Sequence, residues 1–314
     1  MIAEVSRCIS LVKVGPLTPL SIGLHPLTSY VIGNMVLQSN LLQSVGVLAG
    51  VVFTLYVLCQ WSRFVHYHVK HIAAFIWSGF LAAFVIPCAL LRPMDPTNTR
   101  WYTFWERLFF TMPLFQAKII PKNLHYFDTE EPQVLVANHQ SIIDNLGAME
   151  IWPQRCVMVA KKSVLFAGTF GFASWLCGTI FVDRFNAAKA KETTRKIANV
   201  MKRKRTSVWM FAEGTRNYDK SVDMLPFKKG AFYAAIEAQA PIVPVVFSNY
   251  RDHVNAIEHR FDPVEITITI LPPISTKGRT VNDVQALSDE VRECMLEAYR
   301  KSPSKTMKTD LKKE

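Results

Sequence analysis

The chain has 314 residues, enough for one large domain or two of ordinary size. Half of the residues are hydrophobic and the mean hydropathy is positive, a composition that favours membrane contact over a freely soluble protein. The formal net charge of +11 favours anionic partners such as phospholipid head groups, phosphorylated metabolites or nucleic acid. The six cysteines are scattered without a C-x2-C pair, which argues against a zinc site and a disulfide scaffold.

The N-terminal region lacks charge over a long distance, with no Asp, Glu, Lys or Arg between Val14 and Ser62. Three prolines interrupt the first part of this region, so residues 1–40 are expected to be a poorly defined segment without a regular helix.

Residues 41–91 predict a helical hairpin in a membrane. Two uncharged stretches, Leu41–Gln60 and Ile72–Leu91, are each long enough to cross a hydrocarbon core of roughly 30 Å. The polar link between them, Trp61–Lys70, carries basic, aromatic and histidine side chains that suit the head-group layer. Two full spans and a re-entrant hairpin both fit this pattern, and the basic residues on both sides of each stretch choose no orientation.

Residues 92–131 are expected to form an interfacial linker. The stretch Asp95–Lys118 is rich in Trp, Tyr and Phe, with Arg and Lys among them, which predicts an amphipathic helix on the membrane surface. An ordinary helix packed on the globular domain is the alternative.

Residues 132–301 predict an α/β domain with a largely parallel sheet flanked by helices, because near-continuous apolar strands alternate with helical patterns. The expected strands are Gln133–Ala137, Cys156–Ala160, Thr179–Val182, Ser207–Phe211, Ile242–Phe247 and Val264–Leu271. The expected helices include Ala187–Lys204, Lys229–Ala238 and Val281–Arg300. The basic tail, residues 302–314, is expected to be disordered.

The polar segment Asn138–Asp144 directly follows the first of these strands. His139 at the strand end and Asp144 five positions later can form a pair in which the imidazole accepts a proton and the carboxylate orients it. The alternative is a structural histidine that bonds to an aspartate at a helix N-terminus. Ser141 is badly placed as a nucleophile beside His139, and capping a local helix is the role that we expect for it.

Two further segments place arginine at the end of an expected strand, where open α/β sheets bind their ligands. These are Gly178–Arg184, which ends in Asp183 and Arg184, and Phe211–Asn217, which contains Glu213, Gly214, Thr215 and Arg216. Two guanidinium groups can hold one phosphate, while Glu213 can orient an arginine or accept from a substrate hydroxyl. The alternative for each arginine is a solvated ion pair with the neighbouring carboxylate.

Two lysine pairs, Lys161–Lys162 and Lys228–Lys229, can extend a basic lining at the same edge, although lysine pairs are commonly just a solvated surface. No second histidine or carboxylate cluster stands near His139 at ligand spacing, so no metal site is expected. Nucleic-acid binding is also not expected, because the basic residues flank apolar strand ends instead of forming one face.

Taken together and in order, four segments resemble the sequence blocks of the glycerolipid acyltransferases, and of their 1-acyl-glycerol-3-phosphate acyltransferases in particular. They are NHQSIID at 138–144, GTIFVDR at 178–184, FAEGTRN at 211–217 and IVPVV at 242–246. One departure is Ala212, where the family more often has proline; this changes loop stiffness more than chemistry.

The resemblance implies an acyl transfer from acyl-CoA to the sn-2 hydroxyl of lysophosphatidic acid. His139 would be the general base and Asp144 its orienter, while Arg184, Glu213, Gly214, Thr215 and Arg216 would form the phosphate site. Acyl-CoA is then a substrate, no cofactor is expected, and the partners are the two substrates and the bilayer. The expected location is the endoplasmic reticulum membrane, with the catalytic domain facing the cytosol. The alternatives are another lysophospholipid or glycerol 3-phosphate as acceptor, or a non-catalytic protein that binds anionic lipid.

Overall fold

The computed structural model describes residues 26–110, 116–183, 190–302 and 305–306. The chain divides into two compact units, Met1–Leu58 and Cys59–Glu314. Within the first unit, the described residues belong to helix α2 (Pro26–Trp61). The expectation of no regular helix over residues 1–40 is wrong from Pro26 onward, because the fixed φ and missing N–H of proline suit the first position of a helix. Residues 1–25 lie outside the described ranges.

Helix α3 (Arg63–Leu90) belongs to the second unit and has two different faces. One face is buried in the domain through Ala74, Leu81, Ala82, Val85 and Ala89. The opposite face exposes large apolar side chains, namely Ile72, Phe75, Ile76, Phe80 and Phe84. Both α2 and α3 are long and apolar enough to cross a membrane, judged by length and composition, so two helices are present that can form the expected hairpin.

The polar link expected at Trp61–Lys70 is shorter than the sequence predicted. Helix α3 begins at Arg63, directly after Ser62, whose side chain accepts the backbone N–H of Val65 at 3.4 Å. A serine cap satisfies a free N–H group at a helix start, so α3 can begin directly after Ser62. This single non-helical residue separates α2 from α3.

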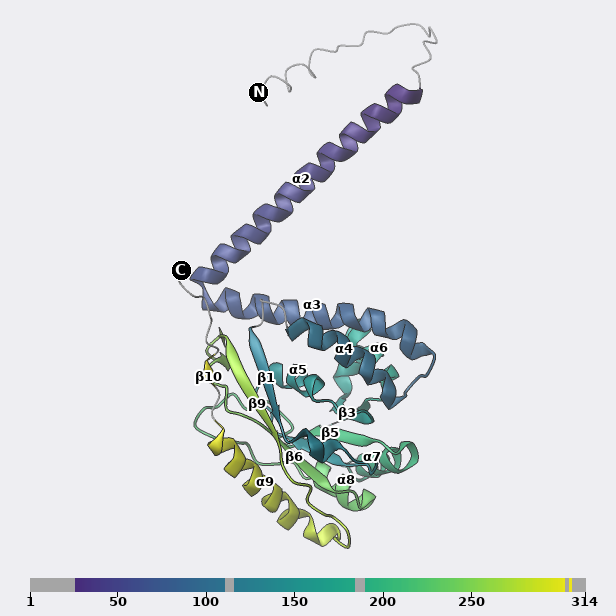
Figure 1. Cartoon of the computed structure of the whole chain (residues 1–314), viewed down its shortest axis with the longest axis vertical. Helices are drawn as coiled ribbons and strands as arrows, with labels where there is room; N and C mark the ends of the chain where they lie inside the picture. The colour runs from purple at the N-terminus through teal and green to yellow at the C-terminus, as the bar shows by residue number, and fades with distance from the viewer. Residues whose placement is uncertain (1–25, 111–115, 184–189, 303–304, 307–314) are drawn as a thin grey trace. The chain divides into compact units, whose positions relative to one another are not determined.

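The domain is built on an eight-stranded, largely parallel sheet (Figure 1). Its strands lie in the order β1 (Ala117–Lys122), β9 (Val264–Ile270), β6 (Ile242–Phe247), β2 (Val134–Ala137), β5 (Ser207–Phe211), β3 (Cys156–Lys161) and β4 (Ile180–Val182), with β10 (Lys305–Thr306) beside β9. The five strands from β6 to β4 are parallel to their neighbours, whereas β9 runs antiparallel to β6. A separate two-stranded ribbon joins β7 (Val254–Asn255) and β8 (Arg260–Phe261).

Strand β2 is buried on both faces, which explains its continuous apolar run. Leu135 and Ala137 join a core that also contains side chains of α3 and α5. Val134 and Val136 join a second core beneath helices on the other face. The remaining helices are α4 (Thr99–Phe110), α5 (Ile143–Glu150), α6 (Gly168–Leu176), α7 (Ala190–Lys204), α8 (Gly230–Ala238) and α9 (Val284–Lys301), with 3-10 turns at Pro96–Asn98, Leu124–Phe127, Lys162–Phe166 and Val281–Asp283.

The six expected strands agree with β2, β3, β4, β5, β6 and β9 to within a residue at either end. The expected start of the domain at residue 132 is too late, because β1 already belongs to the sheet and pairs in parallel with β9. Among the described residues the expected interfacial helix covers Thr99–Phe110, and Lys118, its expected end, belongs to β1; residues 111–115 lie outside the described ranges. The tail is not wholly irregular, because Lys305 and Thr306 pair with β9; residues 303–304 and 307–314 lie outside the described ranges.

Candidate active site

The candidate residues gather at one edge of the sheet. Because β2, β3, β4 and β5 are parallel, their carboxyl ends lie on the same side. His139 follows the end of β2, Lys161 ends β3, Asp183 follows β4, and Glu213 follows the end of β5. The alternation of apolar strands with polar strand ends therefore places residues that are far apart in sequence at one edge of the sheet.

His139 and Asp144 form the expected pair. The Nδ1 atom of His139 lies 2.9 Å from Oδ2 of Asp144, a carboxylate that is fully buried in the first turn of α5. The same oxygen accepts backbone N–H groups from Gln140 and, at 2.8 Å, from Ser141. Since Oδ2 is the acceptor in each of these bonds, Nδ1 of the imidazole is the donor. The other ring nitrogen, Nε2, has no hydrogen bond within the described residues, and 12% of the side chain is exposed.

Tyr250 completes the surroundings of Asp144. Its hydroxyl donates to Oδ1 of Asp144 and lies 2.9 Å from the hydroxyl of Ser141. The Ser141 oxygen accepts the backbone N–H of Ile143 at 3.0 Å, which is the helix-capping role expected for this serine. Burial, together with the charge of Asp144, raises the pKa of Tyr250 well above its ordinary value, so the hydroxyl remains a donor.

The residues on either side of His139 attach it to the neighbouring strand β6. Asn138 donates to the carbonyl of Phe247 at 3.1 Å and accepts the N–H of the same residue at 2.8 Å. The amide of Gln140 donates to the carbonyl of Ser248 at 2.9 Å. Because consecutive side chains alternate in direction along extended chain, His139 faces away from these contacts and stacks on Phe211 of β5, with ring centroids 3.9 Å apart.

Glu213 holds the backbone of His139. Its Oε1 accepts the N–H of His139 at 2.8 Å, and its Oε2 accepts the N–H of Leu225 at 2.8 Å. The carbonyl of His139 accepts the N–H of Asn217 at 2.8 Å, so both backbone groups of the histidine are bound to the loop after β5. Only 2% of Glu213 is exposed, and burial raises the pKa of its carboxyl from 4.5 to about 7.

This position differs from the one expected for Glu213. A carboxylate that is buried, negatively charged when ionised and bonded through both oxygens to backbone amides is not presented to a phosphate or to a substrate hydroxyl. Its geometry is that of a residue that orients His139.

The loop after β5 makes a tight turn at Gly214, where φ is +70°, a conformation that favours glycine. A Cβ at this position would lie 3.0 Å from Cγ of Lys228, so the lysine stem covers the glycine. Thr215 is exposed and Arg216 is half-buried. Within the described ranges Arg216 forms no ion pair with a carboxylate, and its guanidinium lies 3.4 Å from the hydroxyl of Tyr218. Arg216 therefore does not form the solvated ion pair with Glu213 that was the alternative.

The remaining basic candidates are two lysine pairs and Arg184. Lys161, Lys162, Lys228 and Lys229 are all exposed; the first pair spans the end of β3, and Lys229 immediately precedes α8. Arg184 lies outside the described residues. In the part of the chain that the structure describes, no group of three His, Cys, Asp or Glu side chains is arranged to hold a metal ion.

Three positioning residues were not identified from the sequence: Asn217, Tyr250 and Arg251. Tyr250 and Arg251 follow β6, the strand that contains the segment IVPVV, in which the sequence analysis named no candidate site residue. Their position shortly after a parallel strand was the available signal, since polar residues there reach the edge that carries His139.

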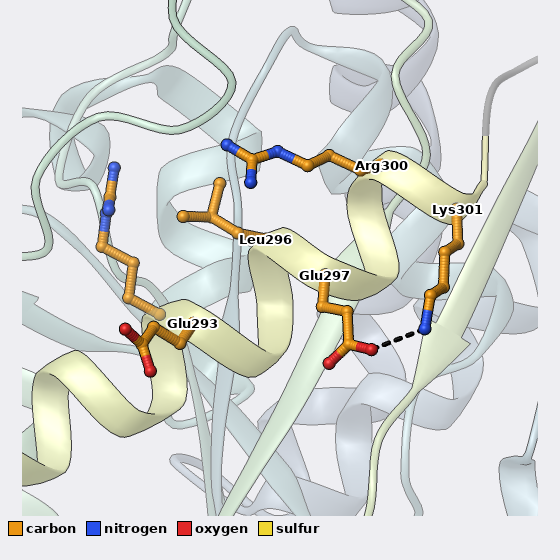
Figure 2. A pocket seen from close by; sticks show the side chains of 6 residues that line it. Glu293, Leu296, Glu297, Arg300 and Lys301 are labelled. Carbon is orange, nitrogen blue, oxygen red and sulfur yellow. Dashed lines mark hydrogen bonds and ion pairs between the residues drawn. The ribbon is translucent and has the colours of Figure 1, made fainter.

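A shallow hollow along α9 lies outside this constellation. Figure 2 shows its lining, which includes Glu293, Leu296 and Arg300, together with the ion pair between Lys301 and Glu297. None of the candidate residues lines it. Exposed ion pairs of this kind contribute little to stability or binding.

Comparison with known proteins agrees with the geometry. A family model described as Acyltransferase matches residues 118–248. The chain is 41% identical over 225 residues to the 1-acyl-sn-glycerol-3-phosphate acyltransferase alpha of Mus musculus, covering 71% of this chain and 78% of that protein. It is 43% identical over 164 residues to the human beta enzyme, covering 52% of this chain and 58% of that protein.

The fold is similar to that in the crystal structure of the 1-acyl-sn-glycerophosphate (LPA) acyltransferase PlsC from Thermotoga maritima. The TM-score is 0.60 at 16% identity, with 76% of this chain and 96% of that chain covered. These similarities confirm the resemblance carried by the four sequence segments. The chain belongs to the acyltransferase family that includes the 1-acyl-sn-glycerol-3-phosphate acyltransferases.

Proposed function

We propose that this protein transfers an acyl chain from acyl-CoA to the sn-2 hydroxyl of 1-acyl-sn-glycerol 3-phosphate, giving phosphatidic acid and free CoA. The observation that carries the proposal is the hydrogen bond from Nδ1 of His139 to Asp144, in a member of the acyltransferase family. This bond fixes the imidazole tautomer in which Nε2 carries a lone pair.

In this proposal His139 is the general base. Nε2 removes the proton of the acceptor hydroxyl while its oxygen attacks the thioester carbonyl, and the C–S bond breaks as CoA leaves. Asp144 stabilises the imidazolium that forms, and the imidazolium gives its proton to the departing CoA thiolate, which restores the neutral base. General-base assistance of this kind contributes about 10²–10⁴-fold to the rate, and holding two substrates in a reactive orientation supplies up to roughly 7–11 kcal/mol in favourable systems.

Arg216 binds the acceptor's phosphate in this scheme. It is half-buried and without a carboxylate partner among the described residues, so its guanidinium is available to a ligand anion. Arg184 is proposed as a second phosphate ligand on the strength of its sequence segment alone. Gly214 shapes the turn that carries Thr215 and Arg216. The proposed lining of the anion site is Thr215 with Lys161, Lys162, Lys228 and Lys229.

The proposed setting is the surface of the endoplasmic reticulum membrane, with the catalytic domain facing the cytosol. Two apolar helices and the exposed apolar face of α3 support membrane association. A membrane-bound site suits acyl chains that are taken from and returned to a bilayer, and the net charge of +11 suits an anionic lipid and the phosphates of CoA. We propose that no cofactor besides the acyl-CoA substrate is needed.

The acceptor is tested with the purified full-length protein in liposomes, supplied with one labelled acyl-CoA and a panel of acceptors. The panel contains lysophosphatidic acid, lysophosphatidylcholine, glycerol 3-phosphate and monoacylglycerol. We expect phosphatidic acid from lysophosphatidic acid, with a kcat/KM at least about tenfold above that of lysophosphatidylcholine or monoacylglycerol, which lack the phosphate monoester and so lose charged hydrogen bonds. Glycerol 3-phosphate has the same phosphate but no acyl chain, so its kcat/KM should also be at least about tenfold lower because it buries less apolar surface. Faster transfer to lysophosphatidylcholine or glycerol 3-phosphate would replace the acceptor, and no transfer to any would favour a non-catalytic lipid-binding protein.

A further inference from the structure

Arg251 is a charged side chain inside the domain, on the segment that follows β6. Only 1% of it is exposed, and among the described residues no carboxylate pairs with it. Its guanidinium instead donates to neutral oxygens: the carbonyls of Asp219 and, at 2.7 Å, Val222, and the hydroxyl of Tyr299 at 2.8 Å. Burying a cation is costly unless its donors are satisfied, and here hydrogen bonds to two separate segments of the chain offset that cost.

On one side, Arg251 fixes the loop that carries Arg216. The carbonyl of Val222 accepts from Arg251 and also, at 2.8 Å, from the side-chain amide of Asn217. Asn217 directly follows Arg216, and its backbone N–H donates to the carbonyl of His139 at 2.8 Å. The guanidinium thereby closes a chain of hydrogen bonds from the loop after β5 (residues 212–229, called the arginine loop here) to the backbone of His139.

On the other side, Arg251 reaches the turn that carries His139. The hydroxyl of Tyr299, which comes from α9 and is 2% exposed, donates to the side-chain oxygen of Gln140 at 3.3 Å. The backbone N–H of Gln140 donates in turn to Asp144. One guanidinium therefore joins the residue after Arg216 and the residue after His139 through two separate routes.

We propose that Arg251 is a positioning residue that sets the distance between His139 and Arg216, with Tyr299 as its anchor on α9. The inference rests on the proposed function, because it requires that Arg216 holds the acceptor's phosphate while His139 activates the hydroxyl of the same molecule. A planar guanidinium can bond to Val222 and Tyr299 at once, whereas the single nitrogen of lysine keeps the charge but does not reproduce the fork.

The test is a double-mutant cycle on the full-length protein in liposomes, with lysophosphatidic acid and acyl-CoA. Arg251→Lys is made alone and together with Arg216→Ala. We expect Arg251→Lys to lower kcat/KM by about 10- to 100-fold in the wild-type background, the range expected for lost hydrogen bonds of a charged group. In the Arg216→Ala background, adding Arg251→Lys should lower kcat/KM by less than about threefold, because the phosphate-binding side chain that Arg251 positions is already absent.

Tyr299→Phe is the second variant. It leaves Arg251 in place and removes only the hydroxyl. We expect kcat/KM to fall by about threefold to tenfold in the wild-type background and by less in the Arg216→Ala background. Arg300→Gln is the matched control: Arg300 comes from the same helix and pairs with Asp223 of the same loop, at 2.8 Å, but on the surface. Its kcat/KM should stay within about twofold of the wild type.

Thermal unfolding of each variant separates loss of fold from loss of alignment. Equal losses from Arg251→Lys in both backgrounds, or equal losses from Tyr299→Phe if the lysine variant does not fold, would overturn the positioning role. A wild-type protein without activity on lysophosphatidic acid would instead overturn the proposed function, and with it the role of Arg251.

Discussion

The carboxylate of Glu213 accepts the backbone N–H of His139 at 2.8 Å, across the gap between the ends of β5 and β2. The second oxygen of the same carboxylate holds Leu225 at 2.8 Å, so one buried side chain joins the histidine to the far end of the arginine loop. The carboxylate here fixes the position of a backbone segment. The direction of the imidazole is then set by Asp144 and its plane by Phe211.

Glu213 should make stability depend on pH. Burial raises the pKa of its carboxyl to about 7, so between about pH 4.5 and 7 the folded state binds more protons than the unfolded state. Stability from this group is therefore lost as pH rises through that window and is level above it. Each unit by which the folded-state pKa exceeds the unfolded-state pKa corresponds to about 1.4 kcal/mol of unfolding free energy lost across this window. Thermal unfolding between pH 4.5 and 8 should show this decline in the wild type and a weaker one in Glu213→Gln, which does not titrate; equal slopes would contradict it.

Removing the hydroxyl of Tyr250 should impair catalysis more than binding. In Tyr250→Phe, Oδ1 of Asp144 loses its donor, and we expect kcat to fall about tenfold with KM nearly unchanged, together with a destabilisation of about 1–3 kcal/mol. Steady-state kinetics with varied lysophosphatidic acid measure both constants. Tyr233→Phe, at a partly exposed position on α8, is the control and should match the wild type. A rise in KM at constant kcat would argue for a binding role instead.

Gly214→Ala should strain the arginine loop. Its φ of +70° and the 3.0 Å approach of a Cβ to Lys228 predict a destabilisation of roughly 1–3 kcal/mol and a higher KM for lysophosphatidic acid. Gly230→Ala is the matched control, because a Cβ there meets nothing within 4 Å. The control should be neutral or stabilise by up to about 1 kcal/mol. If both variants have the same unfolding midpoint and KM, the turn at Gly214 does not constrain the site.

The two long apolar helices should respond differently to truncation. Deletion of residues 1–58 removes most of α2 and should lower resistance to carbonate extraction while the remaining domain still unfolds cooperatively. Deletion through Leu91 also removes Leu81 and Val85, which are buried in the domain, and should abolish cooperative unfolding. A stable, folded product of the longer deletion would show that α3 is dispensable for the domain core.

The sequence predicted the centre of the sheet well, and the reason lies in burial. Strands β2 and β6 are buried on both faces along their whole length, and β5 is buried at Val208 and Trp209, so their apolar runs are clear in the sequence. Strand β1 escaped prediction because it carries two lysines and Pro121, features of an edge strand. Strand β10 has only two residues and exists through its pairing with β9.

The pair of His139 and Asp144 was predictable for a similar reason, since both residues lie within one strand-to-helix turn. The contribution of Tyr250 was not, because it depends on β6 lying beside β2, and 106 residues separate Tyr250 from Asp144. The partners of Glu213 were likewise not predictable from the sequence. Its charge suggested an arginine or a ligand, whereas in the structure the carboxylate accepts two backbone N–H groups.

The most direct test of His139 as the general base is the rate of phosphatidic acid formation by His139→Ala in liposomes, with lysophosphatidic acid and acyl-CoA at saturation. If His139 is the base, kcat should be about 10²–10⁴-fold lower than that of the wild type. The unfolding midpoint should change little, because the bonds of the His139 backbone to Glu213 and Asn217 persist when the ring is removed. A folded His139→Ala variant that retains a kcat within about threefold of the wild type would contradict the assignment of His139 as the base.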